Sequence, residues 1–382
     1  MGTLASIRNR GIGQGKHGEH GCGTNLSRAG DISLSVFSVS RHFRIGLLLA
    51  LVAWIIVVAP AAGQGQQPVL KPGNSLPPIK EPILFNTPEA DAIVAAMQIF
   101  PADNPWNADV SKWPRHPDSD AIVTSIGKDK PLRYNTDMAY VLVPPTQKKI
   151  DLKVVEYPDE SDKGPFPIPD NMPIEGWPAY YTRDLADKKL SLADVQRDKL
   201  GIGGDRHAIV VDPQQGMLYE FFGTKRTDQG WQASCAATFD LKSNKLRIDG
   251  WTSADAAGLA IFAGTIRHDE IQAGMVNHAM RVTVRSTRNA YVAPATHYAS
   301  RKTDKNLPRM GERLRLKTDY DISGFSPPVQ AILKGLKKHG MLVADNGIEW
   351  AISCAPDERI PVLHEELRKV KGEAFEVVVK PE

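Results

Sequence analysis

From residue 139 onward, apolar and polar positions alternate in short runs that turn residues interrupt. The runs are rich in Val, Ile, Phe and Tyr, and segments such as DPQQG, RTDQG and KSNK separate them. This pattern is typical of short β-strands joined by tight turns. We predict strands over residues 139–145, 150–157, 206–212, 217–223, 231–241, 260–267, 277–285, 290–299, 312–320, 340–345, 349–355 and 375–379.

Helical spacing of apolar residues is confined to a few segments. We predict short helices over residues 89–99, 118–126, 191–199, 328–339 and 362–370. The balance predicts a mainly β (α+β) fold, a β-sandwich or jelly-roll-like single domain over residues 89–382 with a few peripheral helices. No sequence period repeats, so a propeller is not indicated.

The N-terminal part differs in pattern from the rest. Residues 41–63 combine a basic flank, an apolar run and a small-residue end, which is the order of a signal peptide. An uncleaved N-terminal membrane anchor is the alternative. Residues 1–40 are polar and Gly-rich, and we interpret them as a disordered leader or a misassigned start. Residues 64–88 have the composition of a Pro- and Gly-rich linker. We therefore expect a secreted or periplasmic protein that contacts a membrane only if the segment stays uncleaved.

Charge excludes one class of partner. Of the 47 basic and 44 acidic residues, six and two precede the apolar run, which leaves 41 basic and 42 acidic residues for the rest. A basic footprint for nucleic acid is missing from that part.

Two cysteines, Cys235 and Cys354, remain after the leader. An even pair in an exported chain predicts a disulfide, and two separate buried thiols are the alternative.

Several segments resemble a family of exported bacterial proteins without an assigned activity. They include GDRHAIVVD, GWTSADAAGL, NHAMRVTV, MGERLRLK and GMLVADNG, and the likeness covers about residues 100–380. The resemblance implies a single continuous domain and no particular reaction.

Ionisable residues inside the strand-like runs are the candidates for chemistry. A carboxylate beside an imidazole on one strand face can orient it as a base, and a buried Glu can serve as an acid. Trp beside a carboxylate can stack a sugar ring and polarise it. The catalytic candidates are Asp205, His207, Glu220, Asp255, Glu270, His278 and Arg281, and the substrate-binding candidates are Trp251, His297 and Tyr298.

A weaker signal is the acidic turn YPDESDKG. Its residues Asp159, Glu160 and Asp162 can offer oxygen ligands to calcium, although a solvated turn explains them equally and the spacing is not that of an EF-hand. No other cofactor is expected, because the strong zinc and nucleotide motifs are absent from the sequence.

Export, β-rich structure, seven Trp residues and these candidates favour a protein that acts on extracellular or cell-envelope polysaccharide. Two catalytic forms are open: a glycoside hydrolase with two carboxyl groups, or a lyase with His207 or His278 as base and Arg281 on a uronate. A non-catalytic module that binds glycan or cell envelope is the first alternative. A metal-dependent hydrolase using His207, His278 and His297 is the second.

Overall fold

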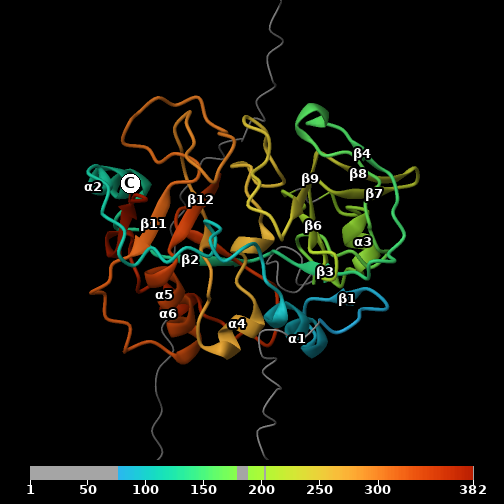
Figure 1. Cartoon of the computed structure of the whole chain (residues 1–382), viewed down its shortest axis with the longest axis horizontal. Coiled ribbons are helices and arrows are strands. Elements are labelled where there is room, and N and C mark those ends of the chain that lie inside the picture. The colour runs from blue at the N-terminus through green and yellow to red at the C-terminus, as the bar shows by residue number, and fades with distance from the viewer. Residues whose placement is uncertain (1–75, 179–187, 202–203, 382) are drawn as a thin grey trace, which may run out of the picture. The chain divides into compact units, whose positions relative to one another are not determined.

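The computed structural model describes residues 76–178, 188–201 and 204–381 (Figure 1). The predicted leader, the signal segment and the first part of the predicted linker lie outside these residues. Within them, no helix is both long enough and apolar enough to span a bilayer.

A six-stranded mixed sheet, sheet B, forms one half of the described fold. Its order is β14 (Phe375–Val378), β11 (Arg313–Leu316), β12 (Met341–Asn346), β10 (Met280–Val284), β13 (Ala351–Cys354) and β2 (Arg133–Thr136). Strand β10 runs parallel to β12 and antiparallel to β13. Its residues Met280, Val282 and Val284 join the main core. Alternation therefore sends Arg281 and Thr283 to the opposite face of the sheet.

A five-stranded mixed sheet, sheet A, forms the other half. Its order is β1 (Ile83–Leu84), β3 (Tyr140–Leu142), β5 (Ala208–Asp212), β6 (Met217–Phe222) and β9 (Cys235–Asp240). In β5, Ile209 and Val211 pack into the main core, whereas Ala208 and Val210 pack into a second core. Sheet A is covered on both faces, which explains why the run AIVVD is continuously apolar.

The second core lies between sheet A and a small three-stranded sheet of β4 (Leu152–Val154), β8 (Gly230–Ala233) and β7 (Lys225–Thr227). In Figure 1, these strands and α3 lie beside β6 and β9, and β11 and β12 form a separate group.

The helices are short and begin at residues suited to that position. In α1 (Pro88–Ala96), the Thr87 hydroxyl accepts a hydrogen bond from the Ala90 N–H at 3.2 Å, and Pro88 starts the first turn. In α3 (Leu192–Gln196), Ser191 and Asp194 form a capping box. The other helices are α2 (Ser119–Ile126), α4 (His268–Ala273), α5 (Pro327–Lys338) and α6 (His364–Leu367), with 3₁₀ turns η1 (Pro158–Glu160), η4 (Phe262–Gly264) and η5 (Gly372–Ala374).

The prediction of short strands with peripheral helices is confirmed in outline, and the fold is a mixed α/β fold. All five predicted helices overlap observed ones. The three sheets are open and mixed, with parallel pairs β3/β5, β4/β8, β10/β12 and β13/β2. No β-sandwich or jelly roll is identified among the described residues.

Two predicted strands are wrong. Residues 260–267 instead hold η4 and a single bridge from Ile266 to Cys354, because the Glu220 carboxylate accepts hydrogen bonds from the Ile261 and Phe262 N–H groups and bends the chain there. Residues 290–299 are irregular apart from a bridge of Tyr291 to Met310. The predicted linker is already packed in its last part, where β1 pairs with β3.

The predicted disulfide is also wrong. Cys235 lies at the start of β9 in sheet A and Cys354 at the end of β13 in sheet B, and both are buried free thiols. Burial raises the pKa of both thiols.

Candidate active site on the polar face of sheet B

Arg281 is at the centre of a buried group of polar side chains on the face of sheet B away from the main core. Its Nη2 and Nε donate to the two carboxylate oxygens of Asp255 at 2.7 and 3.0 Å, and its Nη1 donates to the Ser353 hydroxyl at 2.7 Å. Burial opposes the charge of Arg281, but Asp255 outweighs it and raises the pKa of the guanidinium. We call the following residues the Arg281 cluster: Asp137, Glu175, His207, Asp255, Arg281, Asp345 and Ser353.

His207 contributes a second ion pair to this cluster. Its Nδ1 lies 3.0 Å from Glu175 Oε2, and its Nε2 lies 3.0 Å from the Ala254 carbonyl oxygen. A carbonyl and a carboxylate only accept hydrogen bonds, so both ring nitrogens donate and the ring is an imidazolium. Burial alone would lower the pKa of His207, but Glu175 raises it to about 9. His207 is therefore a cation that holds Glu175, and it has no free nitrogen to act as a base.

Glu175 stays ionised in this position. Burial would raise its pKa, but the hydrogen bond and the charge of His207 outweigh burial and lower it. The His207 backbone N–H also donates to Oε2, at 3.2 Å. Oε1 has no hydrogen-bond partner among the described residues, and the side chain keeps 22% of its surface exposed. Glu175 is thus a fixed carboxylate with one oxygen available.

Two aspartates in the cluster have raised pKa values, in contrast to the lowered pKa of Glu175. Asp137 follows β2, and burial together with the nearby Glu175 raises its pKa to about 7. Its Oδ1 is buried and has no hydrogen-bond partner among the described residues. Asp345 lies in β12, and burial together with Asp255 raises its pKa to about 7. Each of the two residues, counted with its backbone, is half-buried.

Two further predicted catalytic residues, Asp205 and Glu220, are not part of the Arg281 cluster. Asp205 is exposed, and its charge acts on His207 and Asp345 from outside the cluster. Glu220 is fully buried on β6, and both its oxygens accept backbone N–H groups, from Ile261 at 2.9 Å and Phe262 at 2.8 Å. Burial raises the pKa of Glu220 to about 7. Its contacts make it a structural support for η4.

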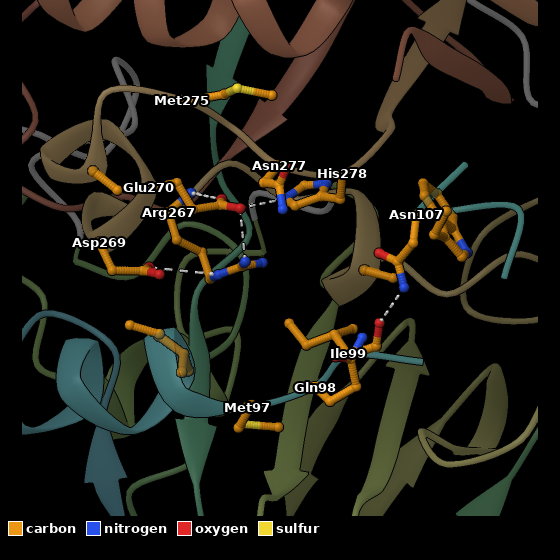
Figure 2. Close-up of a pocket in the computed structure, with 15 residues that line it drawn as sticks. Met97, Gln98, Ile99, Asn107, Arg267, Asp269, Glu270, Met275, Asn277 and His278 are labelled. Atoms are coloured by element: carbon orange, nitrogen blue, oxygen red, sulfur yellow. Dashed lines mark hydrogen bonds and ion pairs between the residues drawn. The ribbon is translucent and has the colours of Figure 1, made fainter. Parts of the chain in front are cut away.

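The predicted residues Glu270 and His278 lie elsewhere, in a pocket of about 270 Å³ between α1 and α4 (Figure 2). Arg267 donates to Glu270 Oε1 at 2.9 Å, and His278 Nε2 lies 2.9 Å from the same oxygen. His278 Nδ1 contacts the Ala279 carbonyl oxygen at 2.7 Å. The seven predicted catalytic residues therefore do not form one cleft. Three belong to the Arg281 cluster (His207, Asp255 and Arg281), two line this pocket (Glu270 and His278), and Asp205 and Glu220 belong to neither.

Asp269 lines the same pocket beside Glu270. Both lie in the first turn of α4 rather than on a strand. Burial raises the pKa of Asp269 to about 6, whereas Arg267 and His278 overcome burial and lower that of Glu270. Arg267 and His278 both contact the Glu270 carboxylate, so Glu270 holds the pocket together.

The three substrate-binding candidates are on or near the surface. Trp251 is half-buried, and the Arg247 guanidinium lies 5.7 Å from its ring centre. The rings of His297 and Tyr298 are stacked at 5.9 Å with a 9° angle, in a segment that is not a strand. Tyr291 stacks on Tyr298 in turn, at 6.2 Å.

Metal ligation finds little support in the described residues. Asp162 accepts from Arg247 at 2.6 Å, and Glu160 accepts from the Thr252 N–H at 3.0 Å, so these predicted calcium ligands contact protein groups. Among the described residues, Asp91, His268 and Asp357 are close enough for a shared ion, but Arg359 pairs with both aspartates. His207, His278 and His297 contact different carbonyl groups and share no centre.

Sequence reasoning missed four members of the cluster, which are Asp137, Glu175, Asp345 and Ser353. Asp345 and Ser353 are polar residues inside apolar strand runs, and this signal could have found them. Glu175 lies in the loop NMPIEGWP, and nothing local distinguishes it.

No protein-family profile, curated protein or solved structure matches the chain, so these sites are interpreted from their own geometry.

Proposed function

We propose that this chain is an exported hydrolase of extracellular or cell-envelope polysaccharide, with Asp137 as general acid and Glu175 as base. The proposal rests on two neighbouring carboxyl groups whose surroundings shift their pKa values in opposite directions. Such a pair is how a site assigns one carboxyl as acid and the other as base at the same pH.

In the proposed reaction, Glu175 Oε1 takes a proton from water, and the water oxygen attacks the anomeric carbon. The bond from that carbon to the glycosidic oxygen breaks, and the Asp137 proton moves to the leaving oxygen. Asp137 with a pKa near 7 keeps this proton near neutral pH. His207 holds Glu175 in place through its Nδ1, whereas Arg281 pairs with Asp255 and touches no reacting atom.

Polysaccharide as substrate is supported by features around the cluster. Trp177, two residues after Glu175, is half-buried and packs against the second core, and an aromatic ring is a surface on which a sugar can stack. The signal-like segment at residues 41–63 supports export, and polysaccharides are found outside the cytosol. A lyase with His207 as base lacks support, because both nitrogens of this ring already donate hydrogen bonds.

The test is reducing-sugar release from a panel of polysaccharides by the parent chain and by Asp137→Asn and Glu175→Gln. We expect either substitution to lower the rate about 10²- to 10⁴-fold. The parent rate should fall above pH 7, where Asp137 loses its proton. Asp228→Asn is the matched control, since its side chain is 98% exposed and lies outside both groups.

Two results would contradict the proposal. Glycan binding without release by the parent would indicate a non-catalytic module. Loss of activity in Asp269→Asn with full activity in Asp137→Asn would move the chemistry to the α4 pocket.

A further inference from the structure

A third region contains a buried positive charge that no described residue neutralises. Arg313, on β11, is only 5% exposed. Its Nη1 donates to the His339 carbonyl at 2.7 Å and its Nη2 to the Pro105 carbonyl at 2.6 Å. No carboxylate of the described residues lies within ion-pair distance of it, and its Nε is buried without a hydrogen-bond partner. A guanidinium has five N–H donors, so three remain unused here.

This situation is unusual within the same protein. The neighbouring Arg315 on the same strand pairs with Glu376, and the buried Arg267 and Arg281 pair with Glu270 and Asp255. A buried charge without a counter-charge is costly, and natural proteins pair such groups. The missing counter-charge at Arg313 therefore points to a group that binds there.

Arg313 also lines a pocket of about 410 Å³, which is in the size range of small-molecule sites. Most of the wall is apolar and comes from Pro105, Trp113, Val292, Pro294, Leu342 and Val378. The guanidinium lies 5.8 Å from the Trp113 ring centre.

The other charged groups of the lining leave the site cationic. Arg309 is neutralised by Glu312, with two hydrogen bonds of 2.9 and 2.8 Å. Lys380 is exposed at the rim, and the exposed Asp103 accepts a hydrogen bond from Asn244. Arg313 and Lys380 are thus the cations without a carboxylate partner in the described wall.

We propose that this pocket binds a small organic carboxylate with an apolar body, whose carboxylate pairs with Arg313 while its body packs against Trp113 and the aliphatic wall. Arginine suits this role, because its planar donors match the two oxygens of a carboxylate. The site is separate from the Arg281 cluster, and the proposal does not depend on the proposed hydrolase activity.

The test is calorimetric titration of the purified chain with benzoate, benzyl alcohol and benzylamine, which share a ring and differ in charge. We expect benzoate to bind about 10- to 100-fold more tightly than benzyl alcohol, and benzylamine to bind most weakly. At ten times its dissociation constant, benzoate should raise the melting temperature by about 3 °C.

Two variants locate the binding. Arg313→Met should abolish the preference for benzoate over benzyl alcohol, and Arg313→Lys should keep the preference but reduce it. Equal binding of the three ligands by the parent chain would overturn the proposal without any variant. An unchanged affinity for benzoate in Arg313→Met would overturn it as well.

Discussion

Arg281 and Arg313 occupy comparable places in sheet B, yet their surroundings differ. Both are almost fully buried, at 3% and 5% exposure. Asp255 holds Arg281 through two hydrogen bonds and raises its pKa, whereas burial with no carboxylate nearby lowers the pKa of Arg313 to about 9. In the first region, Asp255 balances the charge of Arg281, and Arg281 fixes the positions of Asp255 and Ser353. The second lacks a counter-charge, and the comparison shows that burial alone does not make an arginine structural.

The largest difference between the two arginines is expected when each charge is removed in turn. Arg281→Met leaves Asp255 buried without its partner, and we expect it to lower the free energy of unfolding by about 3–5 kcal/mol. Arg313→Met removes an unpaired charge, which offsets the loss of its two hydrogen bonds, so we expect a change of about 1 kcal/mol or less. Urea unfolding measures both, and equal losses would show that the two arginines are equivalent.

Gly311 gives a test confined to the Arg313 pocket. It has φ +79°, and an added Cβ would lie 2.0 Å from the Val292 carbonyl oxygen. We expect Gly311→Ala to cost about 2 kcal/mol or more, because both the backbone angle and the contact must change. Gly324→Ala is the control, since nothing lies within 4 Å of its added Cβ. Similar unfolding midpoints for the two variants would contradict the close approach of Gly311 to the Val292 carbonyl oxygen.

The ion pair of His207 and Glu175 predicts how stability depends on pH. The pKa of His207 is about 9 in the folded chain, above its usual 6.5, so its contribution is complete below pH 6.5 and is lost as the pH rises through 9. The free energy of unfolding should therefore fall by at most about 1.4 kcal/mol per pH unit within that window, which is the slope for one titrating proton. Urea unfolding at several pH values should show a flatter dependence in Glu175→Gln. Identical slopes in the parent and the variant would show that the pair is absent.

The smallest effect is expected at an exposed pair. Arg285 donates to Glu349 at 3.0 Å, but 67% of the arginine side chain is exposed. Glu349→Gln should therefore change the free energy of unfolding by about 0.5 kcal/mol or less, and high salt should remove the difference. A loss as large as that of Arg281→Met would mean that burial does not distinguish the two ion pairs.

Strand alternation in the sequence predicted part of the fold and of the candidate site. The run NHAMRVTV predicts a strand, and β10 confirms it with Arg281 on the face opposite the core, although both faces of β10 are buried and not one alone. The Glu175 pair could not be predicted in the same way. Glu175 is 32 residues from His207 in the chain and lies in a loop, so tertiary packing alone decides that they meet.

Local patterns also fail where a distant side chain fixes the backbone. The apolar run at 260–267 has strand character, but Glu220 on β6 binds its N–H groups and forces a turn. Strands made almost entirely of apolar residues were easier to predict from the sequence, because such runs are typical of strands that are buried on both faces.

The two reduced cysteines have a consequence for handling the protein. Each thiol is enclosed in a different sheet and resists ionisation, so oxidants and alkylating reagents reach it only when the fold opens. The labelling rates of Cys235 and Cys354, measured separately, should therefore report the opening of sheet A and of sheet B.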